Sequence, residues 1–258
     1  MSNLFDLTGK VAFITGASSG LGADAAIAYA QAGADIVLAA RRKDKLEGIA
    51  GQIRSMGRKA LAVGCDVGSE QEIKVAVEQA IAEFGKIDIL INNAGIAALG
   101  TVETMSVEDW NKSVSVNLTG IYLLCKYVVP HMKKAKYGKI VNVSSINAVV
   151  ADKSPMLARH VYNSTKAAVN GLTLGMAATY MQDNITVNSV GPGLFESEMT
   201  EDTLFKNDQF LNMYNALTPA GRPAKRGELN GTLIYLSSDA SSYVTGQYIV
   251  VDGGFTLV

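Results

Sequence analysis

The chain has 258 residues, of which 48% are hydrophobic, and its formal net charge is -1. This length and composition allow one domain with a sizeable core, and the near-zero charge excludes a basic surface for nucleic acid or an anionic membrane. Every apolar run is broken by charge, Gly or Pro before the ~18 residues that a membrane span needs, and Cys65 and Cys125 stand far apart. We therefore expect a soluble protein of the reducing cytoplasm, without a disulfide framework or a structural zinc site.

Seven apolar runs rich in β-branched residues alternate with longer segments of helical character. The runs cover residues 11–15, 35–40, 60–67, 87–92, 139–145, 185–190 and 248–251. They show little polar alternation, which is typical of strands that helices cover on both faces. The pattern predicts an α/β fold, with one Rossmann-like domain over residues 1–258 built on a doubly wound, seven-stranded parallel sheet.

Two helix starts are marked by Ser69 and Ser106, because a carboxylate follows each of them three residues later and completes a capping pattern. After the sixth strand, residues 193–221 are rich in polar residues and Met and form the one irregular region of the chain. We interpret this region as a lid.

A glycine-rich loop follows the first strand and leads into a helix-like segment, residues 23–32. Gly16 permits the tight turn, while Gly20 and Gly22 let a pyrophosphate approach the helix N-terminus, whose free N–H groups attract anions. One alternative is a tight turn without a ligand, since the spacing differs from G-x-G-x-x-G. Another is the G-x-S-x-G elbow of a serine hydrolase, but the last histidine, His160, comes too early for a triad base.

The second strand ends before Arg41 and Arg42, with no Asp or Glu where an NAD site would place one against the ribose 2′-hydroxyl. The guanidinium of Arg41 can bind a 2′-phosphate bidentately and stack on adenine, so we expect NADP(H) as the cofactor. The alternative is a solvated helix start, in which Arg41, Arg42 and Lys43 all face water.

Tyr162 and Lys166 stand four residues apart in a helical stretch, so their side chains share one helix face. An ammonium about 4 Å from a phenol contributes about 4 kcal/mol at an effective dielectric constant of about 20, enough to lower the phenol pKa by about 3 units. On this argument Lys166 alone makes Tyr162 a usable proton carrier. The alternative is a pair that merely decorates a surface helix.

Taken together, motifs along nearly the whole chain resemble those of the short-chain dehydrogenase/reductase family. They are Thr15-Gly16-x-x-x-Gly20-x-Gly22, Asp66-Val67, Asn92-Asn93-Ala94-Gly95, Asn117, Ser144-Ser145, Tyr162-x-x-x-Lys166, Gly191-Pro192-Gly193 and Asp252-Gly253-Gly254. The resemblance implies an oxidoreductase with a nicotinamide cofactor, and it implies a homotetramer. Apolar helix faces near Val128 and residues 169–176, and the tail 255–258, are compatible with that assembly.

The resemblance also implies a role for each catalytic residue. Tyr162 is the general acid and base at the carbonyl oxygen, and Ser145 holds that oxygen. Lys166 binds the nicotinamide ribose and lowers the pKa of Tyr162, while Asn117 holds a water that relays protons. Ser144 and Ser154 are alternatives to Ser145. The implied cofactor contacts are Gly16, Ser18, Ser19, Gly20, Leu21, Gly22, Arg41, Arg42, Asp66, Val67, Asn93, Ala94, Gly95, Tyr162, Lys166, Pro192, Gly193 and Ser197.

The segment between Ser145 and Tyr162 is longer than is usual in the family and should border the substrate pocket. We expect substrate contacts from Ser145, Asn147, Arg159 and His160. Arg159 and His160 can bind the carboxylate of an acidic substrate; the alternative is an exposed polar loop.

The chain ends, residues 4–10 and 252–255, look most like the branch of gluconate 5-dehydrogenases and related sugar or polyol oxidoreductases. We expect a small-molecule alcohol or carbonyl substrate: a sugar acid, a polyol, a hydroxysteroid or another small ketone, with a 3-oxoacyl thioester as the alternative. A non-catalytic nucleotide sensor on the same fold would not need the set Asn117, Ser145, Tyr162 and Lys166.

Overall fold

The structure is a computed structural model that describes residues 3–198 and 205–258. Its centre is a seven-stranded sheet in the order β3-β2-β1-β4-β5-β6-β7, in which neighbouring strands are parallel. The strands are β1 (Val11–Thr15), β2 (Asp35–Ala40), β3 (Ala60–Gly64), β4 (Ile89–Asn92), β5 (Gly138–Val143), β6 (Ile185–Pro192) and β7 (Tyr248–Val251). Because the chain order reverses between β1 and β4, a crevice opens at the carboxyl ends of these strands.

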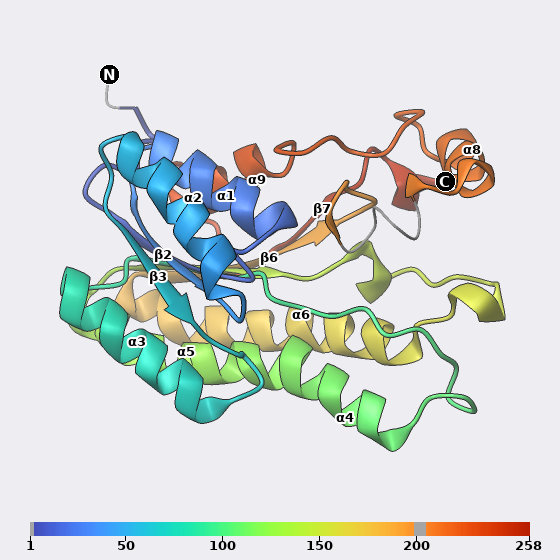
Figure 1. The fold of residues 1–258 in the computed structure, drawn as a ribbon, viewed down its shortest axis with the longest axis horizontal. Coiled ribbons are helices and arrows are strands. Elements are labelled where there is room, and N and C mark those ends of the chain that lie inside the picture. The colour runs from blue at the N-terminus through green and yellow to red at the C-terminus, as the bar shows by residue number, and fades with distance from the viewer. Residues whose placement is uncertain (1–2, 199–204) are drawn as a thin grey trace.

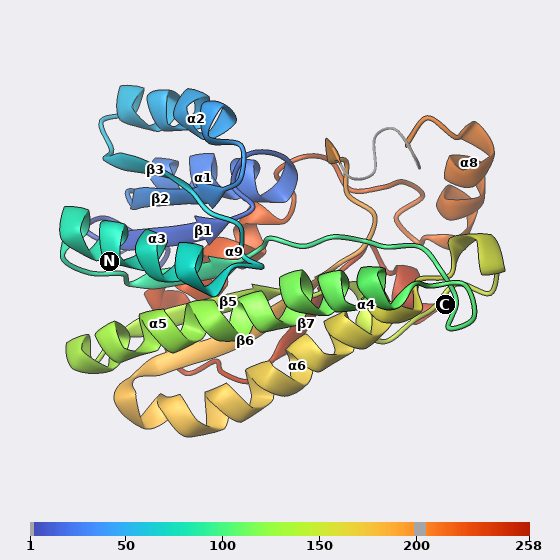
Figure 2. The ribbon, with the colours of Figure 1, turned by 60° about the horizontal axis from the view of Figure 1, so that its bottom comes forward.

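Helices cover both faces of the sheet, as Figures 1 and 2 show. One face carries α1 (Gly20–Gln31), α2 (Lys43–Ser55) and α9 (Asn230–Ser237), and the other carries α3 (Glu70–Phe84), α4 (Val107–Val114), α5 (Gly120–Ala135) and α6 (His160–Tyr180). Phe13 and Ile14, neighbours in β1, belong to different hydrophobic clusters because successive side chains of a strand point to opposite faces. No helix within residues 3–198 and 205–258 is long and apolar enough to cross a membrane.

Thr15 joins the end of β1 to the segment that follows β4. Its Oγ1 accepts hydrogen bonds from the backbone N–H groups of Asn93 (3.0 Å) and Ala94 (3.1 Å). In return, Asn93 Nδ2 donates to the carbonyl oxygen of Thr15 at 2.9 Å. Because Thr15 is buried, water does not compete for these bonds, and the glycine loop and the segment after β4 are held at one side of the crevice.

A second set of buried polar bonds ties α6 to the middle of the sheet. Asn92 Nδ2 donates to Asn142 Oδ1 at 2.8 Å, and Asn142 Nδ2 donates to Thr173 Oγ1 at the same distance. These three side chains come from β4, β5 and α6, and all are buried. These hydrogen bonds therefore fix the position of α6 along the direction of β5. A purely apolar contact would define this position less well.

The predicted fold class is confirmed: the sheet is parallel and seven-stranded, with helices on both faces. Strand lengths differ at the ends. The predicted run 60–67 ends at Gly64, because Asp66 Oδ1 accepts a hydrogen bond from Gly68 N (2.8 Å) and turns the chain out of the sheet. The run predicted to stop at residue 190 continues to Pro192, since Gly191 and Pro192 still pair with β7.

Both predicted helix starts are confirmed. Ser69 Oγ accepts a hydrogen bond from Glu72 N (3.3 Å) at the start of α3, and Ser106 Oγ accepts one from Asp109 N (3.0 Å) at the start of α4. The helices therefore begin where the capping patterns place them.

The prediction that residues 193–221 are irregular is wrong for part of this region, which contains a helix with apolar residues at helical spacing. This helix, α8 (Asp208–Leu217), begins after Asn207, whose Oδ1 accepts a hydrogen bond from Phe210 N at 3.0 Å. Residues 199–204 of the same region lie outside the described residues. That residues 193–221 act as a lid, and that the whole chain is one domain, stay predictions.

Candidate active site

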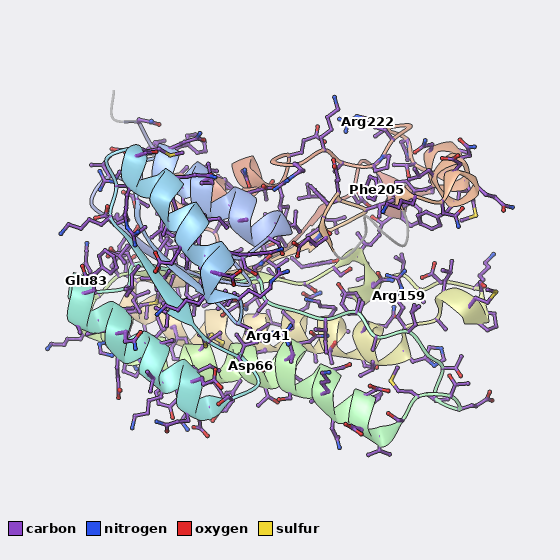
Figure 3. All side chains as sticks on the ribbon, viewed as in Figure 1. Arg41, Asp66, Glu83, Arg159, Phe205 and Arg222 are labelled. Carbon is purple, nitrogen blue, oxygen red and sulfur yellow. The ribbon has the colours of Figure 1, made fainter. Side chains whose placement is uncertain are left out.

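A cleft of about 930 Å³ runs along the carboxyl ends of the strands, at the point where the chain order reverses. The glycine loop, the segments after β2 to β6, the start of α6 and part of α8 all contribute to its walls. Its volume lies near the upper end of the usual range for ligand pockets, roughly 300 to 1,000 Å³, so an extended ligand fits. In Figure 3, Arg41 and Asp66 lie near each other in the middle of the view, and Arg159 lies beside the start of α6.

The glycine loop fits a pyrophosphate. Gly16 and Gly20 have φ angles of +65° and +53°, which residues with a side chain rarely adopt. A Cβ atom on Gly22 would lie 2.4 Å from the carbonyl oxygen of Gly16, so this position tolerates only glycine. Ser19, the N-cap of α1, makes no side-chain capping bond, and the first turn of α1 holds no acidic residue. The free N–H groups of that turn are thus available to an anion.

An anion-binding group of donors stands beside this loop. Arg42 Nη2 donates to Ser18 Oγ (3.0 Å) and Ser19 Oγ (2.9 Å). The carboxylate of Glu198 binds the same guanidinium at 2.7 Å and Lys45 Nζ at 2.6 Å. Hydrogen bonds from Arg42, Lys45 and Ser19 hold the pKa of Glu198 down, to about 2. Arg42, Lys45 and Ser19 therefore already bind one oxyanion, the carboxylate of Glu198.

Arg41 differs from Arg42 in its contacts. It is exposed, lines the cleft and makes no side-chain hydrogen bond or ion pair that is recorded among the described residues. Both arginines are thus at the cleft, as predicted, but Arg42 is the one that contacts the glycine loop.

Most other predicted cofactor contacts also line the cleft. Those that do so are Gly16, Ser18, Ser19, Gly20, Leu21, Asp66, Val67, Asn93, Ala94, Gly95, Pro192, Gly193 and Ser197. Gly22 stands behind the loop, packed against Gly16. The segment after β6 is held in place by a hydrogen bond from Gly193 N to Val251 O at 2.9 Å. Residues from the ends of β1, β3, β4 and β6 are thereby brought to one cavity.

Tyr162 and Ser145 meet at the inner end of the cleft. Ser145 is buried at the end of β5, and its Oγ accepts a hydrogen bond from Asn147 N (3.1 Å). It lies close enough to the Tyr162 hydroxyl to lower the pKa of that group. Ser144 is occupied elsewhere, since its Oγ donates to the carbonyl oxygen of Lys166 at 2.9 Å. Ser154 is exposed and is not among the residues that line the cleft. Ser145 is therefore the serine whose hydroxyl faces Tyr162.

Lys166 lies one helical turn below Tyr162, as the spacing predicts, and only 3% of its surface is exposed. Its Nζ donates to Val143 O at 2.8 Å and lies 5.5 Å from the centroid of the Tyr162 ring. Burial lowers the pKa of Lys166 to about 8, because the low-dielectric surroundings disfavour the ammonium.

The expected lowering of the Tyr162 pKa by Lys166 is wrong. Burial raises the pKa of Tyr162 above its ordinary value, and this effect outweighs the influence of the nearby Ser145 hydroxyl and the charge of Arg159, both of which lower that pKa. The argument from spacing failed because it counted the attraction between the two groups and left out the desolvation of each.

Asn117 lies in a π-helical turn, Ser115–Thr119, between α4 and α5. Its side chain is fully buried: Oδ1 accepts from Ile96 N (2.8 Å), and Nδ2 donates to Ile96 O (2.9 Å) and Thr165 Oγ1 (3.2 Å). A Cβ atom on Gly95 would lie 3.4 Å from Asn117 Oδ1 and 3.5 Å from Lys166 Nζ, so these two groups flank Gly95. Asn117 is close to Lys166, and its role in a proton relay stays a prediction.

The long loop before α6 divides into residues that face the cleft and one that does not. Asn147 and Arg159 line the cleft. His160 does not line it, because its Nδ1 accepts a hydrogen bond from Val102 N at 3.0 Å and turns the ring toward another loop. The structure thus brings Arg159, but not His160, to the predicted substrate pocket.

Tyr248 is a site residue that the sequence reasoning missed. Its hydroxyl donates to the carbonyl oxygen of Ser145 at 2.7 Å and so holds the backbone of that serine. A Cβ atom on residue 191 would lie 2.3 Å from the Tyr248 hydroxyl, so Gly191 is what makes room for the ring. The two residues are far apart in the chain, and only the pairing of β6 with β7 reveals their match.

Comparison with known proteins agrees with this geometry. Residues 16–256 match a family model described as enoyl-(acyl carrier protein) reductase. Gluconate 5-dehydrogenase of Gluconobacter oxydans is 38% identical over 255 residues, which cover 99% of this chain and 98% of that protein. The 3-oxoacyl-[acyl-carrier-protein] reductase FabG of Thermotoga maritima is 36% identical over 253 residues, 97% of this chain and 99% of that protein. The chain belongs to the short-chain dehydrogenase/reductase family.

A solved structure supports the same assignment. The crystal structure of a gluconate 5-dehydrogenase from Burkholderia cenocepacia, in complex with NADP and tartrate, has a TM-score of 0.92 and 36% identity, and covers 99% of this chain and 98% of that one. As a short-chain dehydrogenase/reductase, this chain is an oxidoreductase of the alcohol and ketone type, and the predicted nicotinamide cofactor is confirmed at the level of the family.

The buried ammonium of Lys166 predicts a measurable cost in stability. The folded pKa of about 8 lies below the ordinary value of 10.5, so between these two pH values the unfolded chain binds more protons. We expect Lys166→Met to be more stable than the wild type at pH 7, by on the order of 2 kcal/mol, and this gap to shrink as the pH rises from 8 toward 10.5.

Urea unfolding of both proteins from pH 7 to pH 10 measures this trend. Lys134→Met, which removes an exposed lysine, is the matched control and should leave the pH dependence unchanged. A gap between Lys166→Met and the wild type that stays constant with pH would contradict the low pKa.

Proposed function

We propose that this short-chain dehydrogenase/reductase interconverts a secondary alcohol and a ketone with NADP(H), and that Tyr162 is the general acid and base. The observation that carries the proposal is that Tyr162, Ser145 and Lys166 line the same cleft as the glycine loop, whose helix N-terminus has free N–H groups. A cofactor along that cleft would bring its nicotinamide to the two hydroxyl groups.

The residues divide the chemistry between them. The bound nicotinamide supplies or accepts the hydride at the carbonyl carbon. Ser145 donates a hydrogen bond to the carbonyl oxygen, and Tyr162 delivers a proton to that oxygen as negative charge develops on it. Lys166, held by Val143 O, is placed to bind the nicotinamide ribose hydroxyls and to place a positive charge below Tyr162.

The raised pKa of Tyr162 suits a proton donor. In the direction of ketone reduction the phenol must hold its proton until the oxygen becomes basic, and burial favours the protonated form. In the direction of alcohol oxidation, the charge of Arg159 supports the phenolate.

The other function classes find less support. A hydrolase that used Ser18 would need a histidine, but Arg42 donates to the Ser18 hydroxyl and neither His131 nor His160 lines the cleft. A nucleotide sensor gives no reason for the Tyr162–Ser145 pair. Within the reductases, a sugar acid or polyol, a hydroxysteroid and a 3-oxoacyl thioester all remain candidate substrates, and relatives named for the first and the last are similar to this chain.

We also propose that the chain assembles as a homotetramer and that it acts in the cytoplasm. Val128, Val169 and Met176 are buried within one subunit, so they do not supply an interface, whereas Leu174 and the tail residue Leu257 are exposed apolar groups. The assembly stays a prediction, which sedimentation of the purified chain tests.

Selectivity for NADP(H) should depend on the two arginines after β2. The donors that bind the Glu198 carboxylate match what a 2′-phosphate needs, and Arg41 lines the same part of the cleft. We expect the wild type to prefer NADPH, and Arg41→Ala and Arg42→Ala each to lower the ratio of kcat/KM for NADPH to that for NADH by about 10-fold or more.

Steady-state kinetics with both cofactors measures this ratio. Arg54→Ala, at the far end of the helix α2 that follows the two arginines and outside the cleft lining, is the control and should keep the wild-type ratio. A wild type that prefers NADH, or two variants with unchanged ratios, would exclude a 2′-phosphate site here.

Loss of the Tyr162 hydroxyl tests the reaction itself. Gluconate, polyols, steroid ketones and acetoacetyl thioesters, each assayed with NADP(H), identify a compound that the wild type turns over. With that compound we expect Tyr162→Phe to lower kcat by at least about 100-fold, because the proton donor is gone, while NADPH binding measured by fluorescence persists. Tyr243→Phe, which alters a 94% exposed tyrosine, should behave as the wild type. A Tyr162→Phe protein with more than about a tenth of the wild-type kcat would refute the assigned role.

A further inference from the structure

The substrate end of the cleft has two walls of opposite character. One is the loop between β5 and α6, which carries Arg159, and the other is α8 together with the chain terminus. In Figures 1 and 2 this loop and α8 lie at the same end of the molecule, beside the start of α6. Tyr162 lines the same cleft as both walls.

Arg159 is a rigidly placed and largely enclosed cation. Its backbone is held against Gly100, since Gly100 N donates to Ala158 O (2.8 Å) and His160 N donates to Gly100 O (3.2 Å). Its side chain is only 18% exposed. The guanidinium is close enough to the Tyr162 hydroxyl for its charge to lower the pKa of that group.

The hydrogen-bonding capacity of Arg159 is mostly unused. Its Nε donates to Leu157 O at 3.3 Å, and the nearest carboxylate, Asp152 Oδ2, is 4.0 Å from Nε, beyond hydrogen-bond distance. No recorded hydrogen bond to a described residue involves the two terminal nitrogens. These terminal nitrogens are therefore available to a ligand, and a carboxylate matches the paired donors of a guanidinium best.

The opposite wall is apolar. Three aromatic rings stack in it: Phe210 on Tyr214, with ring centroids 6.3 Å apart, and Tyr214 on Phe255, with centroids 5.1 Å apart. The Tyr214 hydroxyl already accepts a hydrogen bond from Leu194 N (3.4 Å). Met213 and Leu217, both about half exposed, continue this surface along the cleft. Such a wall favours a hydrocarbon group over the hydroxyl groups of a sugar chain.

We propose that the substrate is an oxo acid, or in the other direction a hydroxy acid, whose carboxylate binds Arg159 and whose alkyl or aryl group packs against α8. This inference rests on the proposed function and narrows it to one substrate class. The reacting carbonyl lies between the two ends, at Tyr162 and Ser145. The carboxylate takes the position toward which the loosely placed Asp152 side chain now points.

Three matched compounds separate the two walls. They are 4-oxodecanoate, its methyl ester, and levulinate, which keeps the acid and the ketone but has a methyl group in place of the long alkyl chain. All three carry the same type of alkyl ketone, so their intrinsic reactivities are similar. The ester tests the carboxylate, and levulinate tests the apolar group.

For the carboxylate, we expect wild-type kcat/KM for 4-oxodecanoate to exceed that for the ester by about 10- to 100-fold, the usual range for a charge-assisted hydrogen-bonded pair. Arg159→Gln should bring this ratio close to unity, and Arg159→Lys should keep part of it. Because loss of the Arg159 charge also alters Tyr162, both compounds slow down together, and only the ratio reports substrate binding. Asp152→Asn should raise the ratio, since the competing carboxylate is removed.

For the apolar wall, we expect Leu217→Asn to lower the ratio of kcat/KM for 4-oxodecanoate to that for levulinate by about 10-fold, and to leave the preference for acid over ester in place. Tyr243→Asn, an equally polar change at an exposed site away from the cleft, is the control.

Equilibrium binding makes each outcome decisive. Calorimetric titration of the protein with NADP+ present should give a Kd for 4-oxodecanoate at least about 10-fold below that for the ester in the wild type, and equal values in Arg159→Gln. Equal binding and equal turnover of acid and ester by an enzyme that reduces neutral ketones would overturn this inference and leave the proposed function intact. If the protein turned over no carbonyl compound, the proposed function would be refuted. The binding data would still show whether Arg159 binds the carboxylate.

Discussion

Two hydrogen bonds between Lys166 and the end of β5 place the catalytic groups of this protein. Lys166 Nζ donates to Val143 O, and its own carbonyl oxygen accepts from Ser144 Oγ. They join α6 to the strand end from which Ser145 projects. The position of α6 along β5, and with it the position of Tyr162 relative to Ser145, is thereby fixed. The buried chain from Asn92 through Asn142 to Thr173 fixes the same helix further along. Small displacements of α6 would separate the two hydroxyl groups that we propose bind the carbonyl oxygen.

Burial of Lys166 and Tyr162 changes the pKa of both groups. An enclosed ammonium and an enclosed phenol are both driven toward their neutral forms, which lowers the pKa of Lys166 and raises that of Tyr162. The same exclusion of water strengthens each hydrogen bond to the developing oxyanion. Arg159 adds a second cation, whose charge lowers the pKa of Tyr162. Desolvation of these charged or polar groups costs stability, and the packing of α6 on the sheet offsets that cost.

Local signals in the sequence predicted the sheet, the glycine loop, the helix caps and the Tyr162–Lys166 spacing. Each of these depends on a few neighbouring residues, such as Ser69 with Glu72. What the sequence did not reveal depends on segments that meet only in the fold. Gly191 accommodates Tyr248 from the next strand, and Val102 turns His160 away from the cleft. The helix α8 does have apolar residues at helical spacing, such as Phe210, Met213 and Leu217, but the polar residues around it hid this signal. The direction of the Tyr162 pKa shift also required its burial, which spacing does not show.

The shared binding of one carbonyl oxygen by Tyr162 and Ser145 is most directly tested by a crystal structure of the protein with NADP+ and a ketone that it reduces. With the oxidised cofactor no hydride is available, so the ketone remains unreacted in the site. The expected result is a ketone oxygen within about 3 Å of both Tyr162 Oη and Ser145 Oγ. A ketone oxygen bound by other groups, with Tyr162 and Ser145 still paired to each other, would contradict the assignment.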